Sequence, residues 1–83
     1  MSSNTEKAFD ARIARAQLQV QDAERDLARR EKDLASSRSF YGEFSMVAHT
    51  QARDLNLARQ ALERARAQLA AEQQAKQNYR DGK

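Results

Sequence analysis

The chain has 83 residues and a formal net charge of +3, with 15 Lys and Arg against 12 Asp and Glu. A third of the residues are charged and many of the hydrophobic ones are alanine, so a chain of this length can bury only a thin core. The absence of cysteine excludes disulfides and thiolate metal sites, while the absence of proline permits very long helices.

Targeting and membrane segments are not evident in the sequence. No run of about 18 apolar residues occurs, so we expect no membrane insertion. The opening residues, MSSNTEKAFD, are polar and lack the apolar segment of a signal peptide. We therefore expect a single domain in the cytoplasm.

Apolar residues in the first half of the chain recur at alternating spacings of four and three, which is typical of a coiled-coil helix. Position a of this heptad carries Ile13, Val20, Leu27, Leu34 and Tyr41. Position d carries Phe9, Ala16, Ala23, Arg30 and Ser37. The pattern predicts a first helix over residues 4–38.

The midpoint of the chain, residues 36–47, reads SSRSFYGEFSMV and separates two Ala-rich and Arg-rich segments. Serine and glycine lower helix propensity here, and a glycine costs about 1 kcal/mol relative to alanine in a helix. We therefore predict that the chain turns at residues 39–44.

The second half continues the heptad without a skip. Position a carries Ala48, Leu55, Leu62, Leu69 and Lys76. Position d carries Phe44, Gln51, Ala58, Ala65, Glu72 and Tyr79. This predicts a second helix over residues 45–79, followed by Gly82 as a C-terminal cap.

Large residues at a and alanines at d favour an antiparallel pair, because the a residues of one helix then face the d residues of the other. Folding about residues 42 and 43 matches large residues with alanines in consecutive layers: Leu27 with Ala58, Ala23 with Leu62, Val20 with Ala65, and Ala16 with Leu69. We predict an all-α, antiparallel two-helix coiled-coil hairpin that self-associates into a four-helix bundle. A single long helix in an antiparallel dimer would form the same layers and stays open as an alternative.

Catalytic and metal-binding patterns do not emerge from the sequence. His49 is the only histidine, and zinc needs three or four ligands. A bare helical pair also offers no pocket in which a general base could act. Because acidic and basic residues alternate along both segments, we do not expect nucleic acid as a partner. We expect a protein without enzymatic activity, cofactor or metal.

Five large side chains near the predicted turn are more than a two-helix tip can enclose: Phe40, Tyr41, Phe44, Met46 and Val47. We expect Tyr41 and Phe44 to close the contact line between the helices. Phe40, Met46 and Val47 would then remain exposed for contact with another protein, since aromatic residues and Met are enriched in interface cores.

Arg30 occupies a d position, where a buried charge is costly. We expect its stem to pack between the helices and its guanidinium to reach solvent beside Asp26. Two interpretations stay open: Arg30 fixes the register or the choice of partner, or it merely lies at a thin and exposed layer.

Residues 55–75, LNLARQALERARAQLAAEQQA, resemble the descending helix in the coiled-coil hairpin of bacterial membrane-fusion proteins, the periplasmic adaptors of efflux pumps and type I secretion systems. Those hairpins carry an Arg, a Leu four residues on and a Ser seven further, near a tip that meets an outer-membrane channel. Arg30 and Leu34 match the first two positions, and Tyr41 replaces the serine. The resemblance implies partner contacts at Arg30, Leu34 and the tip, and a periplasmic setting.

The expected function is a protein–protein interaction module that forms a dimer with itself and presents an apolar tip to a second protein. One alternative is an adaptor hairpin docked on an outer-membrane channel. The other is an RNA-binding bundle similar to the Rop-like hairpins, whose layers also alternate alanine with large residues. For that alternative, Arg15, Arg29 and Arg64 share heptad position c and could line one face.

Overall fold

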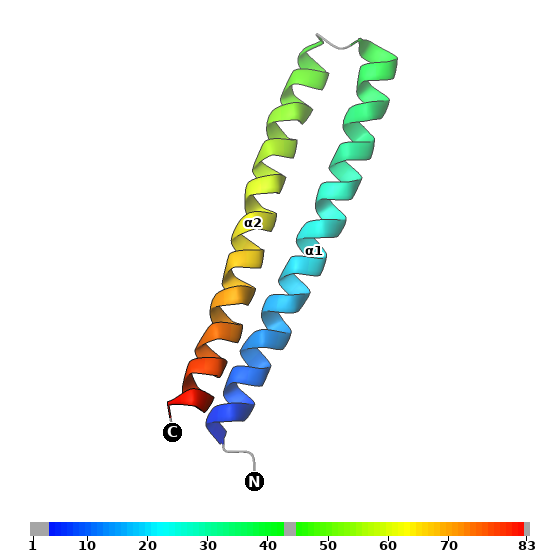
Figure 1. Ribbon diagram of the computed structural model, residues 1–83. Coiled ribbons are helices and arrows are strands. Elements are labelled where there is room, and N and C mark those ends of the chain that lie inside the picture. The colour runs from blue at the N-terminus through cyan, green and yellow to red at the C-terminus, as the bar shows by residue number, and fades with distance from the viewer. Residues whose placement is uncertain (1–3, 43–44, 83) are drawn as a thin grey trace.

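The computed structural model describes residues 4–42 and 45–82 of the chain. Two long helices, α1 over Asn4–Tyr41 and α2 over Met46–Asp81, lie antiparallel and side by side (Figure 1). The described part of the chain is therefore an all-α hairpin 59 Å long and 17 by 11 Å across. The predicted hairpin is confirmed, and the single long helix is wrong, because the chain reverses between α1 and α2.

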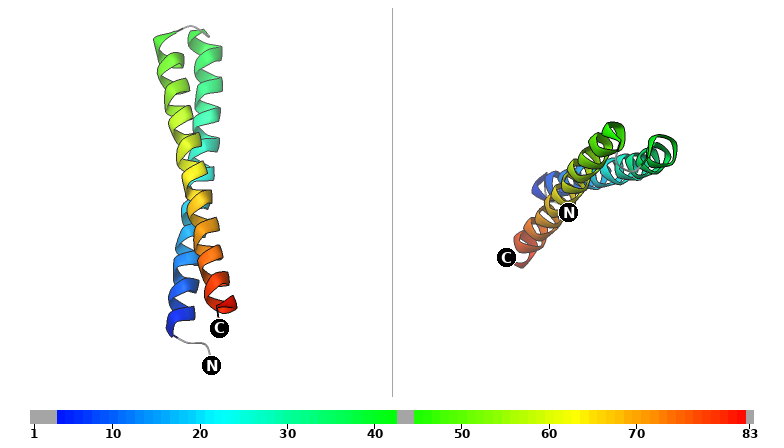
Figure 2. Two further views of the ribbon diagram at one scale, coloured as in Figure 1. Left: turned by 60° about the vertical axis from the view of Figure 1, so that its left-hand side comes forward. Right: turned by 90° about the horizontal axis from the view of Figure 1, so that it is seen from above.

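The heptad pattern predicts which side chains lie between the helices. The buried hydrophobic residues all come from a or d positions: Ala16, Leu34, Ala48, Leu55, Ala58 and Leu62. Figure 2 shows that the two helices cross each other gently along their length. Side chains repeating every seven residues can therefore stay on the contact line from one end to the other.

The core is thin, as the composition predicts. Leu34, Ala48 and Leu55 form a buried cluster in the half of the hairpin toward the tip, and Leu27 and Ala52 pack against them. Among the described residues, no large side chain is fully enclosed. Because burial of apolar area contributes only about 25 cal/mol per Å², such a core gives little stability in excess of the entropy lost on folding.

The helix α1 continues three residues beyond its predicted end at residue 38, through Ser39 to Tyr41. Serine is only a weak helix breaker, so the serines of this segment do not stop the helix. Gly42 does: it has φ of +94°, in the left-handed region that glycine adopts without penalty. Its N–H donates to the carbonyl oxygen of Arg38 at 3.1 Å, which is the bond of a left-handed C-terminal cap.

The helix α2 begins at Met46, directly after the cap residue Ser45. Ser45 has an extended backbone, and its Oγ accepts a hydrogen bond from the N–H of Ala48 at 3.1 Å. At the other end, α2 runs two residues past the predicted end at 79 and stops at Gly82, as predicted. The N–H of Gly82 donates to the Asn78 carbonyl at 2.9 Å, although its φ of −76° is not left-handed.

The variant Gly42→Ala distinguishes the hairpin from a continuous helix, because it changes the free energy of unfolding in opposite directions in the two structures. In the hairpin, Gly42→Ala should lower the free energy of unfolding by roughly 1–2 kcal/mol, because an L residue resists a left-handed backbone. Apart from the neighbouring residues in the chain, no atom of the described residues lies within 4 Å of a Cβ built there, so the cost is conformational and not a clash. In a continuous helix the same change would stabilise by about 1 kcal/mol. Urea unfolding followed by circular dichroism measures the sign, with Ser39→Ala in α1 as the control that should be mildly stabilising.

The close approach of the helices at alanine layers predicts that larger side chains will not fit. Ala58 is 7% exposed, and Ala58→Leu should destabilise the hairpin by about 1–3 kcal/mol through overpacking. Ala28→Leu, the same change at an exposed position of α1, should be nearly neutral. Thermal unfolding compares the two variants, and equal melting temperatures would show that the layer at Ala58 is not close-packed.

Candidate functional site

The tip of the hairpin exposes four large side chains, which we call the tip patch: Phe40, Tyr41, Met46 and Val47. Their exposed fractions are 85%, 61%, 80% and 43%, in that order. Two come from the last turn of α1 and two from the first turn of α2, so the chain reversal brings them to one end of the molecule (Figure 1). The expected exposure of Phe40, Met46 and Val47 is confirmed.

Tyr41 does not close the contact line between the helices, so that prediction is wrong. The last closed layer holds Ser37 and Ala48, which are 8% and 1% exposed. The layer at Tyr41 lies beyond the first residue of α2, so α2 has no helical residue to cover it. Its ring instead packs on Phe40, with centroids 5.4 Å apart and planes tilted by 59°. Phe44, the other residue predicted there, lies outside the described residues.

A shallow groove continues from the tip patch along α2. Met46, Val47, Thr50 and Gln51 line it. The Oε1 atom of Gln51 is buried and accepts no hydrogen bond from a described residue. An unpaired buried amide oxygen is costly, so the layer at Gln51 lowers the stability of this end of the contact line.

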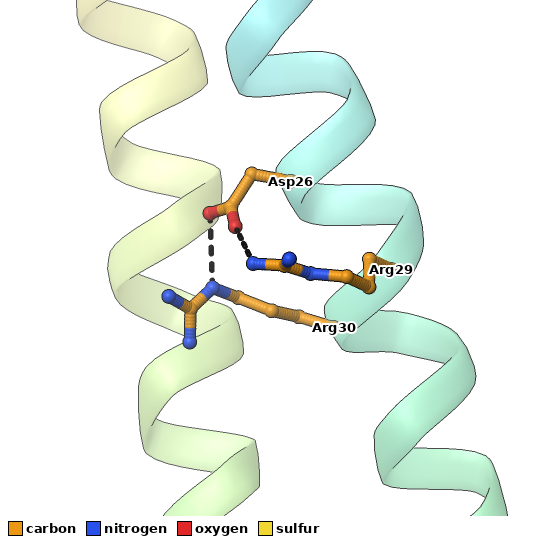
Figure 3. Close-up of polar contacts among 3 residues, drawn as sticks. All are labelled: Asp26, Arg29 and Arg30. Carbon is orange, nitrogen blue, oxygen red and sulfur yellow. Dashed lines mark hydrogen bonds and ion pairs between the residues drawn. The ribbon is translucent and has the colours of Figure 1, made fainter.

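Arg30 behaves as its d position predicts. Its side chain leaves α1 between the helices and remains 40% exposed, and its Nε donates to Oδ2 of Asp26 at 2.9 Å (Figure 3). The Nη2 atom of Arg29 donates to the other carboxylate oxygen, Oδ1, at 3.1 Å. These hydrogen bonds are local to one turn of α1, so they stabilise that helix.

These contacts shift the acid–base properties of the pair. The hydrogen bond from Arg30 lowers the pKa of Asp26; partial burial opposes this shift, and attraction to both arginines supports it. The same hydrogen bond raises the pKa of Arg30, as does attraction to the carboxylates of Asp26, Asp54 and Asp33. Arg30 therefore stays charged inside a group of three carboxylates, two from α1 and one from α2.

Leu34, the second residue of the adaptor-like pair, lies in the core and is 4% exposed. A partner could touch Leu34 only if the two helices separated. Arg30 is accessible, so the structure does not bring these two residues to a common outer surface.

Sequence reasoning missed a difference between the two long sides of the hairpin. In an antiparallel pair, the g positions of both helices lie on one side, next to the d positions; we call this the d/g side. Three grooves lined by both helices open there. Alanines at several d positions, such as Ala16, Ala58 and Ala65, leave space beside the larger residues, so hollows form on the d/g side. The heptad positions contain this signal, but it becomes visible only when both helices are placed side by side.

The open end of the hairpin is held by contacts between α1 and α2. Lys76 pairs with the carboxylate of Asp10, and the rings of Phe9 and Tyr79 lie with their centroids 5.5 Å apart. The guanidinium of Arg12 covers the Phe9 ring at 6.0 Å from its centroid. These contacts fix the ends of the helices opposite the tip.

Residues 4–42 and 45–82 contain neither a metal-binding cluster nor a membrane-spanning helix. No group of three or more His, Asp or Glu side chains in that part of the chain could hold a metal ion, and His49 is exposed. Neither α1 nor α2 contains an apolar stretch sufficient to traverse a bilayer.

Comparisons of the chain with protein-family models, curated proteins and solved structures found no match. The likeness to adaptor hairpins therefore depends on Arg30, Leu34 and residues 55–75 alone.

The lowered pKa of Asp26 gives a measurable pH dependence. The pKa of Asp26 is lower in the folded hairpin than in the unfolded chain. The Asp26–Arg30 pair therefore stabilises the hairpin fully when the pH is above the unfolded pKa. This stabilisation is lost as the pH falls through the folded pKa. Titration of the Asp26 carboxyl by NMR should show a midpoint below the usual aspartate range. Arg30→Met should raise that midpoint more than Arg29→Gln, because the Arg30 hydrogen bond is the main cause of the shift. A larger rise in the Arg29 variant would contradict this assignment.

Proposed function

We propose that this protein is a non-enzymatic interaction module that associates with itself and presents the tip patch to a second protein. The observation that carries the proposal is the exposure of four large side chains at the chain reversal. Scattered single apolar residues on a surface need no explanation, but a contiguous group does.

The tip patch is not required by the fold. The reversal depends on Gly42 and Ser45, whose hydrogen bonds cap the two helices, and the contact line closes at Ser37 and Ala48. The large side chains lie beyond that last closed layer. Their apolar area remains available, and covering it would contribute about 25 cal/mol per Å² to binding.

The composition of the patch indicates the kind of partner. Phe40 and Tyr41 present two rings in tilted contact, a pair that could enter a pocket. Met46 is flexible and can adapt to an irregular apolar wall. A groove between helices of another protein offers such a surface, and the hairpin would carry the patch to it at the end of a 59 Å shaft.

Substitution of the tip tests the proposal. The triple variant Phe40→Ser, Met46→Gln and Val47→Ser should retain the melting temperature of the wild type, because these side chains are largely exposed. It should lose a partner that the immobilised wild-type hairpin retains from an extract of the source cells. A role in the core predicts the reverse, since loss of a buried Phe alone costs about 3–5 kcal/mol.

Leu18→Gln provides the matched control. Leu18 is 59% exposed on α1 and far along the chain from the tip, so its replacement removes an exposed apolar side chain outside the tip patch. The control should retain the partner. Equal retention by wild type and triple variant, or loss of helix in the triple variant, would leave the patch without a binding role.

A further inference from the structure

Charge on the d/g side of the hairpin is divided between its two halves. Toward the tip, Asp26, Asp33 and Asp54 surround the single guanidinium of Arg30 and line two adjoining grooves. Toward the open end, a third groove carries Arg12, Arg15 and Arg64 with one carboxylate, Glu72. One half is therefore acidic and the other basic, although charges alternate along the sequence.

The groups in both halves are short of partners within the hairpin. Asp33 and Asp54 attract Arg30 but form no ion pair within 4 Å of any described residue, whereas Asp26 is bonded to both Arg29 and Arg30. In the basic half, Arg15 and Arg64 are likewise unpaired within residues 4–42 and 45–82, and Arg12 contacts only the face of a ring. Their charges remain available to a molecule that covers this side.

We propose that a second copy of the chain covers the d/g side, lying antiparallel to the first, so that the acidic half of each copy faces the basic half of the other. This rests on the self-associating module proposed above and specifies its surface and orientation. Such an interface has two-fold symmetry, in which the same patch serves both copies.

The spacing of the residues supports this orientation. Arg12, Gln19, Asp26 and Asp33 occupy successive g positions of α1. A two-fold axis midway between Gln19 and Asp26 places Arg12 of one copy against Asp33 of the other. It also places Gln19, an amide donor, against Asp26. A parallel arrangement would instead set the acidic halves of both copies against each other, which costs free energy.

The centre of the side permits close approach. The same axis passes α2 near Ala61, a g residue that lines the groove beneath the exposed Leu57. The grooves to either side are floored by alanines, Ala58 in one and Ala16 with Ala65 in the other. Small residues at the centre let two helices approach, and Leu57 then loses its exposure to water.

Charge reversal tests the proposal on the full chain. Sedimentation equilibrium of the wild type should show a dimer whose dissociation constant rises with salt. Arg12→Glu or Asp33→Arg should each weaken the dimer by about tenfold or more, since two like-charged contacts replace two attractive ones. An equal mixture of these two variants should regain wild-type affinity as a heterodimer, because each contact is then complementary.

The double variant Arg12→Glu with Asp33→Arg carries both changes in one chain and should also dimerise like the wild type. It keeps the test valid even if a single variant folds poorly. Arg66→Glu and Glu31→Arg make the same charge changes at exposed e positions, on the opposite side, and should leave the dimer unchanged. Circular dichroism at the same concentrations reports folding.

Failure of the mixture or of the double variant to dimerise overturns the antiparallel pairing. If Arg66→Glu and Glu31→Arg weaken the dimer as much as the d/g-side variants do, the dimer interface is not the d/g side. A monomer over a hundredfold range of concentration overturns the association itself. If that monomer instead binds a single-stranded RNA oligonucleotide, and Arg12→Glu abolishes the binding, the basic half is a phosphate site. The tip variant described above should dimerise normally, so loss of tip binding and loss of the dimer are separate results.

Discussion

The structure depends on four consecutive layers of the hairpin in which the heptad pairs a large residue with an alanine. Ala58 and Ala16 are buried at d positions, where the heptad sets them opposite Leu27 and Leu69, and this lets the two helix backbones come close. The same pairing sets the limits of the molecule. Alanine contributes little apolar area, so the core is thin, and the free energy gained by burial is small against the entropy of ordering two long helices.

The chain reversal requires only a few residues, and this has a consequence for the tip. Gly42 supplies the left-handed backbone that ends α1, and Ser45 supplies the side-chain oxygen that begins α2. Neither residue buries apolar surface. The contact line between the helices runs from Ser37 and Ala48 toward the open end and is formed by heptad residues. The large side chains of the tip patch lie beyond it, and no described contact shows them stabilising the fold.

Periodicity predicts the helices and the contact line, because a seven-residue repeat in a proline-free chain has few other solutions. The snorkelling of Arg30 toward Asp26 also follows from sequence, since both residues lie within one turn. The exposure of Tyr41 does not: the heptad continues through it, but the pattern does not show where Gly42 stops the helix. The two charged halves were hidden for another reason. Acidic and basic residues alternate along the chain, but folding brings the g positions of both helices to one side, where acidic residues gather in one half and basic residues in the other.

The hollow d/g side and the thin core have a common origin. Small d residues, such as Ala16, Ala58 and Ala65, bring the helices together and at the same time leave grooves where larger side chains would have stood. Filling those grooves from within the chain would push the helices apart. Filling them from outside would add apolar contact without disturbing the hairpin. A hairpin with alanine layers therefore buries more additional apolar surface on binding a second molecule than a hairpin with leucine at both the a and d positions. The uneven charge of the same side favours one orientation for that molecule over the other.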